Sequence, residues 1–267
     1  MKQLFYSLLM LCFFLVSCQS KFEKLQKSKD YAMKLQKADE YYDQRKYSKA
    51  NTLYEELLTV YKGTKNFENI YYRYANTFYF NNNYLAASYH FKNFADLFPK
   101  SAKAEECEYL NALCLYKLSP DYTLDQSNTI KSIGEMQAFV NTHPESKHAR
   151  EANRSIDESR EKLEMKDVYG AELYFKITEY RAAGVAFEQI LRKYPDSKSA
   201  DYYASMVIRS NYEYALNSVT EKQAERFSRV IADYSDFVKK YGNSKYKADM
   251  DRIKTLSSQS LKKIEKL

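Results

Sequence analysis

The sequence predicts an all-α chain in which five pairs of helices repeat and one further helix caps the C-terminus. The 267 residues include only five glycines and four prolines, and no stretch alternates apolar with polar residues as a half-buried strand would. One pattern of apolar residues followed by a chain breaker also recurs five times. We therefore expect one continuous array of stacked repeats rather than ordinary globular domains.

The clearest copy of the pattern spans residues 180–200. Four of its residues recur three or four positions apart, on one face of a helix: Tyr180, Ala183, Phe187 and Ile190. Pro195 ends this helix, because the residue before a proline is pushed out of the α region. Ser197 is expected to cap the next helix, with Ala200 in its first turn. A small residue followed by an aromatic and a proline is typical of the second helix of a tetratricopeptide (TPR) unit, so we expect a right-handed TPR solenoid.

Four further copies set the register of the array. They place comparable residues in the same order: Tyr47, Ala50, Tyr54, Leu57 and Gly63; Tyr84, Ala87, Phe91, Phe94 and Pro99; Thr129, Ser132, Met136, Phe139 and Pro144; Phe227, Val230, Tyr234, Phe237 and Gly242. A serine follows the breaker in four of the five copies: Ser101, Ser146, Ser197 and Ser244. The shared signal for stopping and restarting a helix indicates true repeats.

Residues 1–17 are predicted to be a signal peptide outside the fold. Lys2 supplies the positive start, and the apolar run from Leu4 to Val16 is shorter than the roughly 20 residues of a transmembrane helix. The run ends in Leu-Val-Ser-Cys18, which resembles a bacterial lipobox, so we expect acylation of Cys18. The alternative is an ordinary signal peptide with an incidental cysteine. No aspartate follows Cys18, and we expect a lipid anchor at the periplasmic face of the outer membrane.

The first three repeats are expected within residues 31–144, after a polar lipidated tether at residues 18–30. Their first helices should bury small and aromatic residues: Ala38 and Tyr41 in repeat one, Ala75 and Phe78 in repeat two, and Ala112 in repeat three. An insertion at Leu118–Gln126 should separate the helices of repeat three, because Ala112 lies further from Ser132 than Ala38 lies from Ala50.

Residues 145–267 are expected to hold repeats four and five and the capping helix. The charged stretch from Lys147 to Lys166 has no loop signal, so it should run directly into the first helix of repeat four. In that helix Ala171 and Tyr174 take the buried positions, by analogy with the first two repeats.

The last repeat is expected to break near Asn217–Thr220. The segment from Lys245 to Leu267 carries four apolar residues on a lysine-rich helix: Ile253, Leu256, Leu261 and Ile264. A solenoid needs a terminal helix with one polar face, and capping is the role we favour for it. Docking to a membrane or a partner by the same helix is the alternative.

Neither catalysis nor metal binding is indicated. Cys107 and Cys114 lie two turns apart on one predicted helix, about 10.5 Å between Cα atoms, which exceeds the roughly 7 Å limit for a disulfide. They are expected to be reduced thiols in the core. No histidine has ligand spacing relative to them, and the sequence contains no Gly-x-Ser-x-Gly, glycine-rich phosphate loop or His-Glu-x-x-His. We therefore expect a protein that is not an enzyme and takes no cofactor.

Binding of other polypeptides is the class of function that remains. The first helices of a TPR array line a concave groove, and the register places these residues along it: Asp39, Tyr42, Tyr72, Asn76, Tyr79, Tyr109 and Tyr116. Rigid aromatic rings give contact area at low entropic cost, and an amide can bond a peptide backbone. With Lys117 nearby, such a groove suits an extended peptide that is rich in aromatics and ends in a carboxylate. The alternative is that several of these tyrosines pack between helices.

The formal charge of +7 comes from 42 basic and 35 acidic residues scattered through the chain. A nucleic-acid surface would concentrate its bases in a stripe. The charge therefore indicates a solvated helical surface, with affinity for anionic membranes or proteins as the alternative.

Two segments, together with the lipobox and the five repeats, resemble the BamD family of TPR lipoproteins from the outer-membrane β-barrel assembly machinery. One is the insertion Ser-Pro-Asp-Tyr-Thr-Leu-Asp-Gln at residues 119–126, followed by a helix and His-Pro-Glu-Ser-Lys-His-Ala at 143–149. The other runs from Leu173 through Tyr-Arg-Ala-Ala at 180–183 to Tyr-Pro-Asp-Ser at 194–197. The family usually has Arg-Gly before the Tyr-x-Ala-Ala, where this chain has Ile177-Thr178-Glu179.

The resemblance implies a non-enzymatic subunit whose C-terminal repeats bind the periplasmic domains of a BamA-like barrel protein. It also implies that the N-terminal groove receives the C-terminal strands of unfolded outer-membrane proteins. Accessory lipoproteins are further candidates as partners. Such strands often end in an aromatic residue, which suits a groove lined with tyrosines. The alternative in the same class is another periplasmic TPR lipoprotein adaptor, tied to the Tol-Pal system or to pilus assembly.

Overall fold

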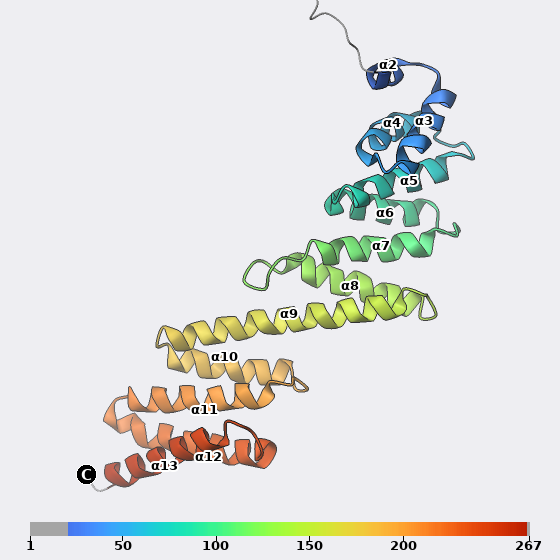
Figure 1. Ribbon diagram of the computed structural model, residues 1–267. Helices are drawn as coiled ribbons and strands as arrows, with labels where there is room; N and C mark the ends of the chain where they lie inside the picture. Colours follow the sequence, from blue (N-terminus) through green and yellow to red (C-terminus); the bar gives the residue numbers. More distant parts are fainter. Residues whose placement is uncertain (1–20, 266–267) are drawn as a thin grey trace, which may run out of the picture. The chain divides into compact units, whose positions relative to one another are not determined.

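A computed structural model describes residues 21–265, and within them the chain is all-α (Figure 1). The predicted signal peptide and Cys18 lie outside the described residues. The helices are α2 (Lys21–Lys27), α3 (Tyr31–Asp43), α4 (Tyr47–Val60), α5 (Phe67–Phe80), α6 (Tyr84–Leu97), α7 (Ala104–Lys117), α8 (Ser127–Thr142), α9 (Ala149–Lys176), α10 (Tyr180–Lys193), α11 (Ala200–Leu216), α12 (Thr220–Tyr241) and α13 (Lys247–Ile264). The predicted TPR helix pairs are confirmed.

The chain forms two compact units. Unit 1 comprises Met1–Ser119 with Asn128–Ile156, and unit 2 comprises Pro120–Ser127 with Asp157–Leu267. The boundary falls inside α9 and not in the linker at residue 144, because α9 is one continuous helix from Ala149 onward. This continuity confirms that the charged stretch after Lys147 runs into the first helix of repeat four.

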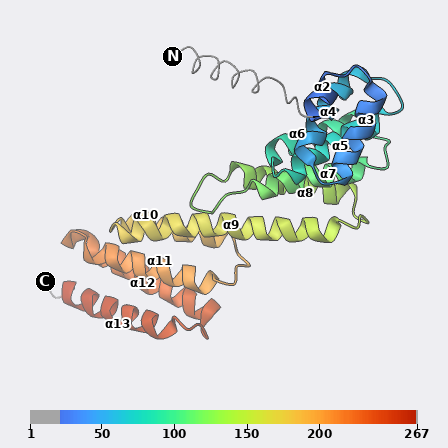
Figure 2. The same cartoon turned by 45° about the horizontal axis from the view of Figure 1, so that its top comes forward.

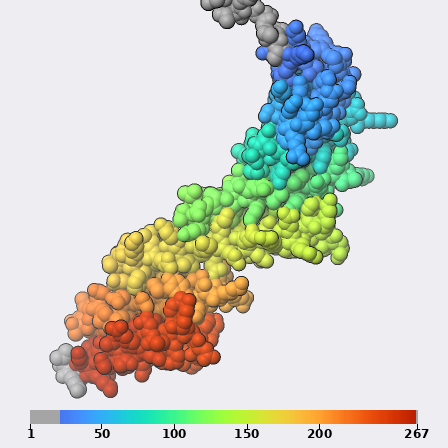
Figure 3. Space-filling view, in the orientation of Figure 1, coloured from blue at the N-terminus to red at the C-terminus, as the bar shows by residue number. Residues whose placement is uncertain are grey.

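In unit 1 each helix packs on the next one along the chain, from α3 through α7. The space-filling view shows the consequence, since colours within this unit follow the sequence without distant segments mixing (Figure 3). The register predicted from the pattern is confirmed by burial. The three positions before the breaker are nearly all inaccessible: Ala50, Tyr54 and Leu57; Ala87, Phe91 and Phe94; Ser132, Met136 and Phe139; Ala183, Phe187 and Ile190; Val230 and Phe237. Tyr234 in the fifth copy is the exception, because it is partly exposed and its hydroxyl donates to Asp251 at 2.6 Å.

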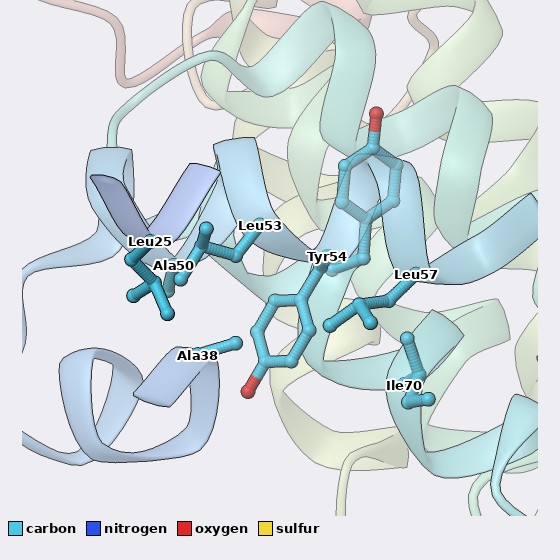
Figure 4. Packing of buried hydrophobic residues seen from close by; sticks show 8 residues of the cluster. Leu25, Ala38, Ala50, Leu53, Tyr54, Leu57 and Ile70 are labelled. Atoms are coloured by element: carbon cyan, nitrogen blue, oxygen red, sulfur yellow. The ribbon is translucent and has the colours of Figure 1, made fainter. Parts of the chain in front are cut away.

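The first repeat shows how one pair of helices closes. Ala38 on α3 and Ala50 on α4 are both completely buried in the same core cluster, where the two helices pack together. The ring of Tyr54 fills the space beside them, together with Leu57 (Figure 4). Burying a large side chain of this kind stabilises the fold by roughly 1.5–3 kcal/mol relative to leaving it exposed.

Helix α2 is packed onto repeat one, which differs from the polar tether expected at residues 18–30. Leu25 enters the core formed by α3 and α4. The Lys34 side chain is 0% exposed, and its ammonium donates to the Gln26 carbonyl at 2.9 Å and pairs with Glu56 at 2.7 Å. A lysine buried in this way holds α2 in place, because its ammonium would lose the Gln26 carbonyl as an acceptor if α2 moved away.

Four linker serines make the same pair of hydrogen bonds, which we call the serine latch. Each hydroxyl accepts from the backbone N–H two residues later. Each also donates, at 2.5–2.7 Å, to a carboxylate on the first helix of the preceding repeat: Ser101 to Glu68, Ser146 to Glu105, Ser197 to Glu164 and Ser244 to Asp201. The latch therefore ties the start of one repeat to the first helix of the repeat before it.

The latch corrects the expectation that Ser197 caps α11. The N-cap residue of α11 is Ser199, and its side chain makes no capping hydrogen bond. A single turn closed by the Ala200 N–H on the Ser197 carbonyl, at 3.1 Å, precedes the helix. The hydroxyl of Ser197 is thereby directed to Glu164 and away from the N-terminus of α11.

The insertion of repeat three is closed by its own Asp-Gln pair. The Gln126 amide is buried and donates to the carbonyls of Asp121 at 2.7 Å and Leu124 at 3.1 Å. The Asp125 carboxylate accepts from the Ser127 N–H at the start of α8. Both residues therefore shape the loop itself.

In unit 2, α10 packs on α11, and α12 packs on both α11 and α13 (Figure 2). The predicted break in repeat five is confirmed, since α11 ends at Leu216 and α12 begins at Thr220. The terminal α13 buries Met250 and Ile253 against its neighbours. Tyr174 was expected to be buried but is 45% exposed, because its neighbour Phe175 packs on the cluster of Ala171 and Phe187 in its place.

Three turns between paired helices place a residue in the left-handed region: Arg45, Asn82 and Thr178 have φ values of 58°, 59° and 65°. Asparagine tolerates this conformation, whereas a β-branched threonine is strained by it. The turn between α9 and α10 is therefore strained at Thr178.

Removing one latch should lower stability measurably. We expect Ser197→Ala to reduce the free energy of unfolding by about 1–2 kcal/mol, because Glu164 loses a donor and the linker turn loses its acceptor. The shift is read from the urea midpoint at unchanged slope. Ser199→Ala is the matched control in the same linker and should stay within about 0.5 kcal/mol of the parent. Equal effects of the two substitutions would contradict the role of the latch.

Lys34→Met should release α2 while leaving repeats two and three intact. The partly buried Gln26 carbonyl and the Glu56 carboxylate would lose their donor, at a cost of about 1–3 kcal/mol. We expect faster amide hydrogen exchange across Lys21–Lys27 and little change elsewhere. Lys37→Met is the control, since Lys37 pairs with Glu40 on the surface. Unchanged exchange in α2 of the Lys34 variant would show that other contacts hold the helix.

Candidate functional site

The candidate site lies on the first helices of repeats one to three, which are α3, α5 and α7. Its first cluster centres on Tyr42 at the end of α3. The half-buried ring meets Tyr47, Tyr54 and Phe80 edge-on at 5.6–6.4 Å between centroids. The guanidinium of Arg73 lies 4.9 Å from the centre of the same ring. Burial raises the pKa of Tyr42 to about 12, so the phenol stays protonated and can donate a hydrogen bond.

Arg73 connects this cluster to α5. Its guanidinium is 3.3 Å from Asp39 and 3.2 Å from Asp43, two carboxylates of α3. The Tyr54 hydroxyl donates to the same Asp39 carboxylate at 2.6 Å. Two acids therefore compensate the charge of Arg73, and its stacking on Tyr42 fixes the orientation of the ring.

Tyr72 forms a second cluster with α7. Its hydroxyl donates to Glu106 at 2.9 Å, and the Lys103 ammonium lies 4.6 Å from the ring centre. Burial and then the neighbouring Glu106 carboxylate raise the pKa of Tyr72, because both disfavour the phenolate. Lys103 donates to the Asn69 side chain and has no carboxylate partner among the described residues.

Tyr79, near the end of α5, leads a third cluster. Its ring contacts Phe80, Tyr84 and Phe91 at 5.6–6.3 Å. The Lys117 ammonium lies 5.5 Å from the ring of Tyr84, and no carboxylate within the described part of the chain pairs with it. Tyr116, on the same helix as Lys117, is half-buried and packs on the core of α7, α8 and α9.

Two of the predicted groove residues have buried side chains. Asn76 is 5% exposed, and its amide donates to the Tyr72 carbonyl of its own helix at 2.8 Å. Tyr109 is 3% exposed, with its ring stacked on His148 at 4.3 Å and packed against Phe139. The prediction that these two side chains line an open groove is therefore wrong, because both are buried between packed helices. Tyr42, Tyr72, Tyr79 and Tyr116 keep partly exposed rings.

The charged partners Arg73, Lys103 and Glu106 were not predicted from the sequence. Arg73 lies on α5, Glu106 lies on α7 and Lys103 directly precedes α7. Each is one to six positions from a site tyrosine, in a chain where charged residues are common. No motif distinguishes them from other surface charges. Their contacts with Tyr42 and Tyr72 cross from one repeat to the next, which only the packed structure reveals.

Unit 2 presents a different surface. Apolar side chains follow each other at four-residue intervals along α9 and just past its end, each about half exposed: Met165, Tyr169, Leu173 and Ile177. Beside them the insertion is held by contacts of Tyr122 with Tyr169 and of Lys166 with the Leu124 carbonyl, at 2.9 Å. We call these four side chains the α9 stripe.

The two cysteines are free and buried, as expected. Burial raises the pKa of both Cys107 and Cys114, to about 12 for the latter, which keeps them as thiols. Within residues 21–265, no cluster of histidine, cysteine or carboxylate side chains is arranged to hold a metal ion. In the same range, no helix combines the length and apolar character needed to span a bilayer.

Comparison with known proteins identifies a family and a curated relative. The family described as YfiO, outer membrane lipoprotein, matches residues 27–226 and 174–261. A curated relative, outer membrane protein assembly factor BamD of Caulobacter vibrioides, is 25% identical over 116 residues, which are 43% of this chain and 38% of the relative.

Solved TPR structures are also similar to the chain. The TPR domain of P58(IPK) is 14% identical with a TM-score of 0.41, covering 89% of this chain and 67% of that one. The TPR2AB domain of yeast Sti1 in its pHSP90 complex is 12% identical with a TM-score of 0.38, covering 85% and 98%. Since the family matches together run from residue 27 to residue 261, the chain belongs to the YfiO family of outer membrane lipoproteins.

Proposed function

We propose that this chain is a non-enzymatic scaffold of an outer-membrane β-barrel assembly machinery, anchored by acylation of Cys18 at the periplasmic face. Its N-terminal repeats bind the C-terminal strands of unfolded outer-membrane proteins. Its C-terminal repeats bind the periplasmic domains of a BamA-like barrel protein. The named function of the Caulobacter relative, outer membrane protein assembly, supports this proposal.

The observation that carries the peptide-binding role is the row of partly exposed tyrosines on successive first helices. Tyr42, Tyr72, Tyr79 and Tyr116 come from three repeats, so an extended chain crossing α3, α5 and α7 can meet each in turn. Their hydroxyls and ring edges are held by neighbouring aromatics and charges, which lowers the entropic cost of binding. Such a surface favours strands rich in aromatic residues.

Two lysines near this row suit the end of such a strand. Lys103 lies over Tyr72 and Lys117 over Tyr84, and neither pairs with a carboxylate in the described structure. A peptide carboxylate beside either ammonium would form a charge-assisted hydrogen bond. Arg73 is less suited to this role, because Asp39 and Asp43 already compensate its charge.

The C-terminal repeats offer a surface for a folded partner. The α9 stripe exposes four large apolar side chains in a row, and an apolar row of this kind on a protein surface is typical of an interaction site. Accessory lipoproteins are further candidates for contact with the scaffold.

Peptide binding is tested by titrating the mature chain with a peptide that copies the C-terminus of an outer-membrane protein and ends in phenylalanine. We expect Tyr79→Ala and Tyr116→Ala each to weaken binding by about 5- to 30-fold, as loss of a well-packed aromatic contact does. Tyr89→Ala is the matched control, since Tyr89 lies on α6, a second helix, and is 64% exposed. Amidation of the peptide should also weaken binding. Equal affinities for all three variants would remove the groove from the proposal.

Partner binding is tested by recovering the tagged protein from solubilised outer membrane. We expect a large β-barrel protein to co-purify with it, and Tyr169→Ser with Leu173→Ser to reduce the yield of that protein several-fold through loss of buried apolar area. Leu85→Ser, at an equally apolar and more exposed site on α6, should leave the yield unchanged. Recovery of only non-barrel envelope proteins would favour the adaptor role in another system.

A further inference from the structure

The end of unit 1 where the described chain begins carries five exposed lysines. Three belong to α2 and two to the start of repeat one's second helix: Lys21, Lys24, Lys27, Lys46 and Lys49. Among the described residues, none of the five forms an ion pair with a carboxylate. The acids nearest in sequence are largely engaged elsewhere, since Glu40 pairs with Lys37 and Asp43 with Arg73. Glu23 is the one acid within α2.

Two aromatic rings bring Lys49 next to α2, with Lys46 beside Tyr41. Phe22, in the first turn of α2, packs edge-on against Tyr41 of α3 at 5.7 Å. The Lys49 ammonium lies 5.5 Å from the centre of each ring, and the Lys46 ammonium lies 6.0 Å from that of Tyr41. The beginnings of α2 and α4 are therefore neighbours. We call this group, with Phe22 and Tyr41 at its centre, the basic end face.

The basic end face is fixed to the folded body. Leu25 inserts in the core of repeat one, and the buried Lys34 bonds the Gln26 carbonyl at the last turn of α2. Lys21 follows Cys18 by only three residues, and three residues reach at most about 11 Å. A lipid attached to Cys18 would therefore hold this face close to the bilayer surface. The lysines cannot swing away as they would on a flexible tether.

We propose that the basic end face binds the headgroups of an anionic phospholipid bilayer. Clustered lysines next to a membrane attachment point are attracted to the negative surface potential of such a bilayer. The ring of Tyr41 and the ring of Phe22 suit the boundary between headgroups and acyl chains. The binding orients unit 1 on the membrane and does not depend on the peptide-binding role proposed above.

The test measures vesicle binding by the mature chain from residue 18 with Cys18→Ser, so that no acyl chain contributes. Vesicles contain either phosphatidylcholine alone or phosphatidylcholine with 30% phosphatidylglycerol. The test variant combines Lys21→Gln, Lys24→Gln, Lys46→Gln and Lys49→Gln. The matched control removes the same charge from exposed lysines of unit 2, of which two also lie over tyrosine rings: Lys198→Gln, Lys240→Gln, Lys245→Gln and Lys262→Gln.

We expect the parent and the control to bind the anionic vesicles at least about tenfold more tightly than the test variant, given the contribution of each lysine near such a surface. Binding should weaken as salt is raised and should be absent on neutral vesicles. Circular dichroism and thermal unfolding of the test variant should match the parent. Equal losses in both variants, or equal binding to neutral and anionic vesicles, would overturn the proposal.

Discussion

The close crossing of paired helices at small residues is the constraint on which the rest of this structure depends. The small residues at these positions are all essentially inaccessible in repeats one, two and four: Ala38 and Ala50, Ala75 and Ala87, Ala171 and Ala183. A larger side chain at such a crossing would force the helices apart. Because each crossing is built locally, the apolar cores form a series of separate clusters along the chain. Stability then depends on contacts between neighbouring repeats, and the serine latches add a polar contact at four of these junctions.

Tyrosine supplies both an apolar ring for these thin cores and a hydroxyl that bonds polar groups near the surface. A repeated arrangement buries the ring between repeats while its hydroxyl donates to a carboxylate of a neighbouring helix, as Tyr54 does to Asp39 and Tyr72 to Glu106. Tyr202 and Tyr203 do the same in unit 2 with Glu172 and Glu164. Burial raises the pKa of each of these phenols, so they remain donors at physiological pH. The same residue type therefore serves the core and the proposed peptide surface.

This dual use explains why the candidate site could be predicted only in part. The register correctly identified the helices, because their positions follow from the TPR period, whereas the peptide-binding role of the row of tyrosines stays a prediction. It could not decide how deeply each ring is buried. Tyr109 became a core residue because His148, from the linker before α9, stacks on it. The Asn76 amide donates to a carbonyl of its own helix. Arg73, Lys103 and Glu106 belong to the site because they contact its tyrosines across neighbouring repeats.

The sequence by itself determined the helical class, the repeat register and the two reduced cysteines. It also determined which face is buried on the second helix of nearly every repeat. These follow from local periodicity, chain breakers and distances along a helix. Only the tertiary structure decided that α2 docks on repeat one, that Ser197 bonds Glu164 and not the N-terminus of α11, and that the Asp125-Gln126 pair closes its own loop. Each of these features depends on a partner many residues away or on the path of a turn. The spacing of apolar residues encodes no information about distant partners or turn paths.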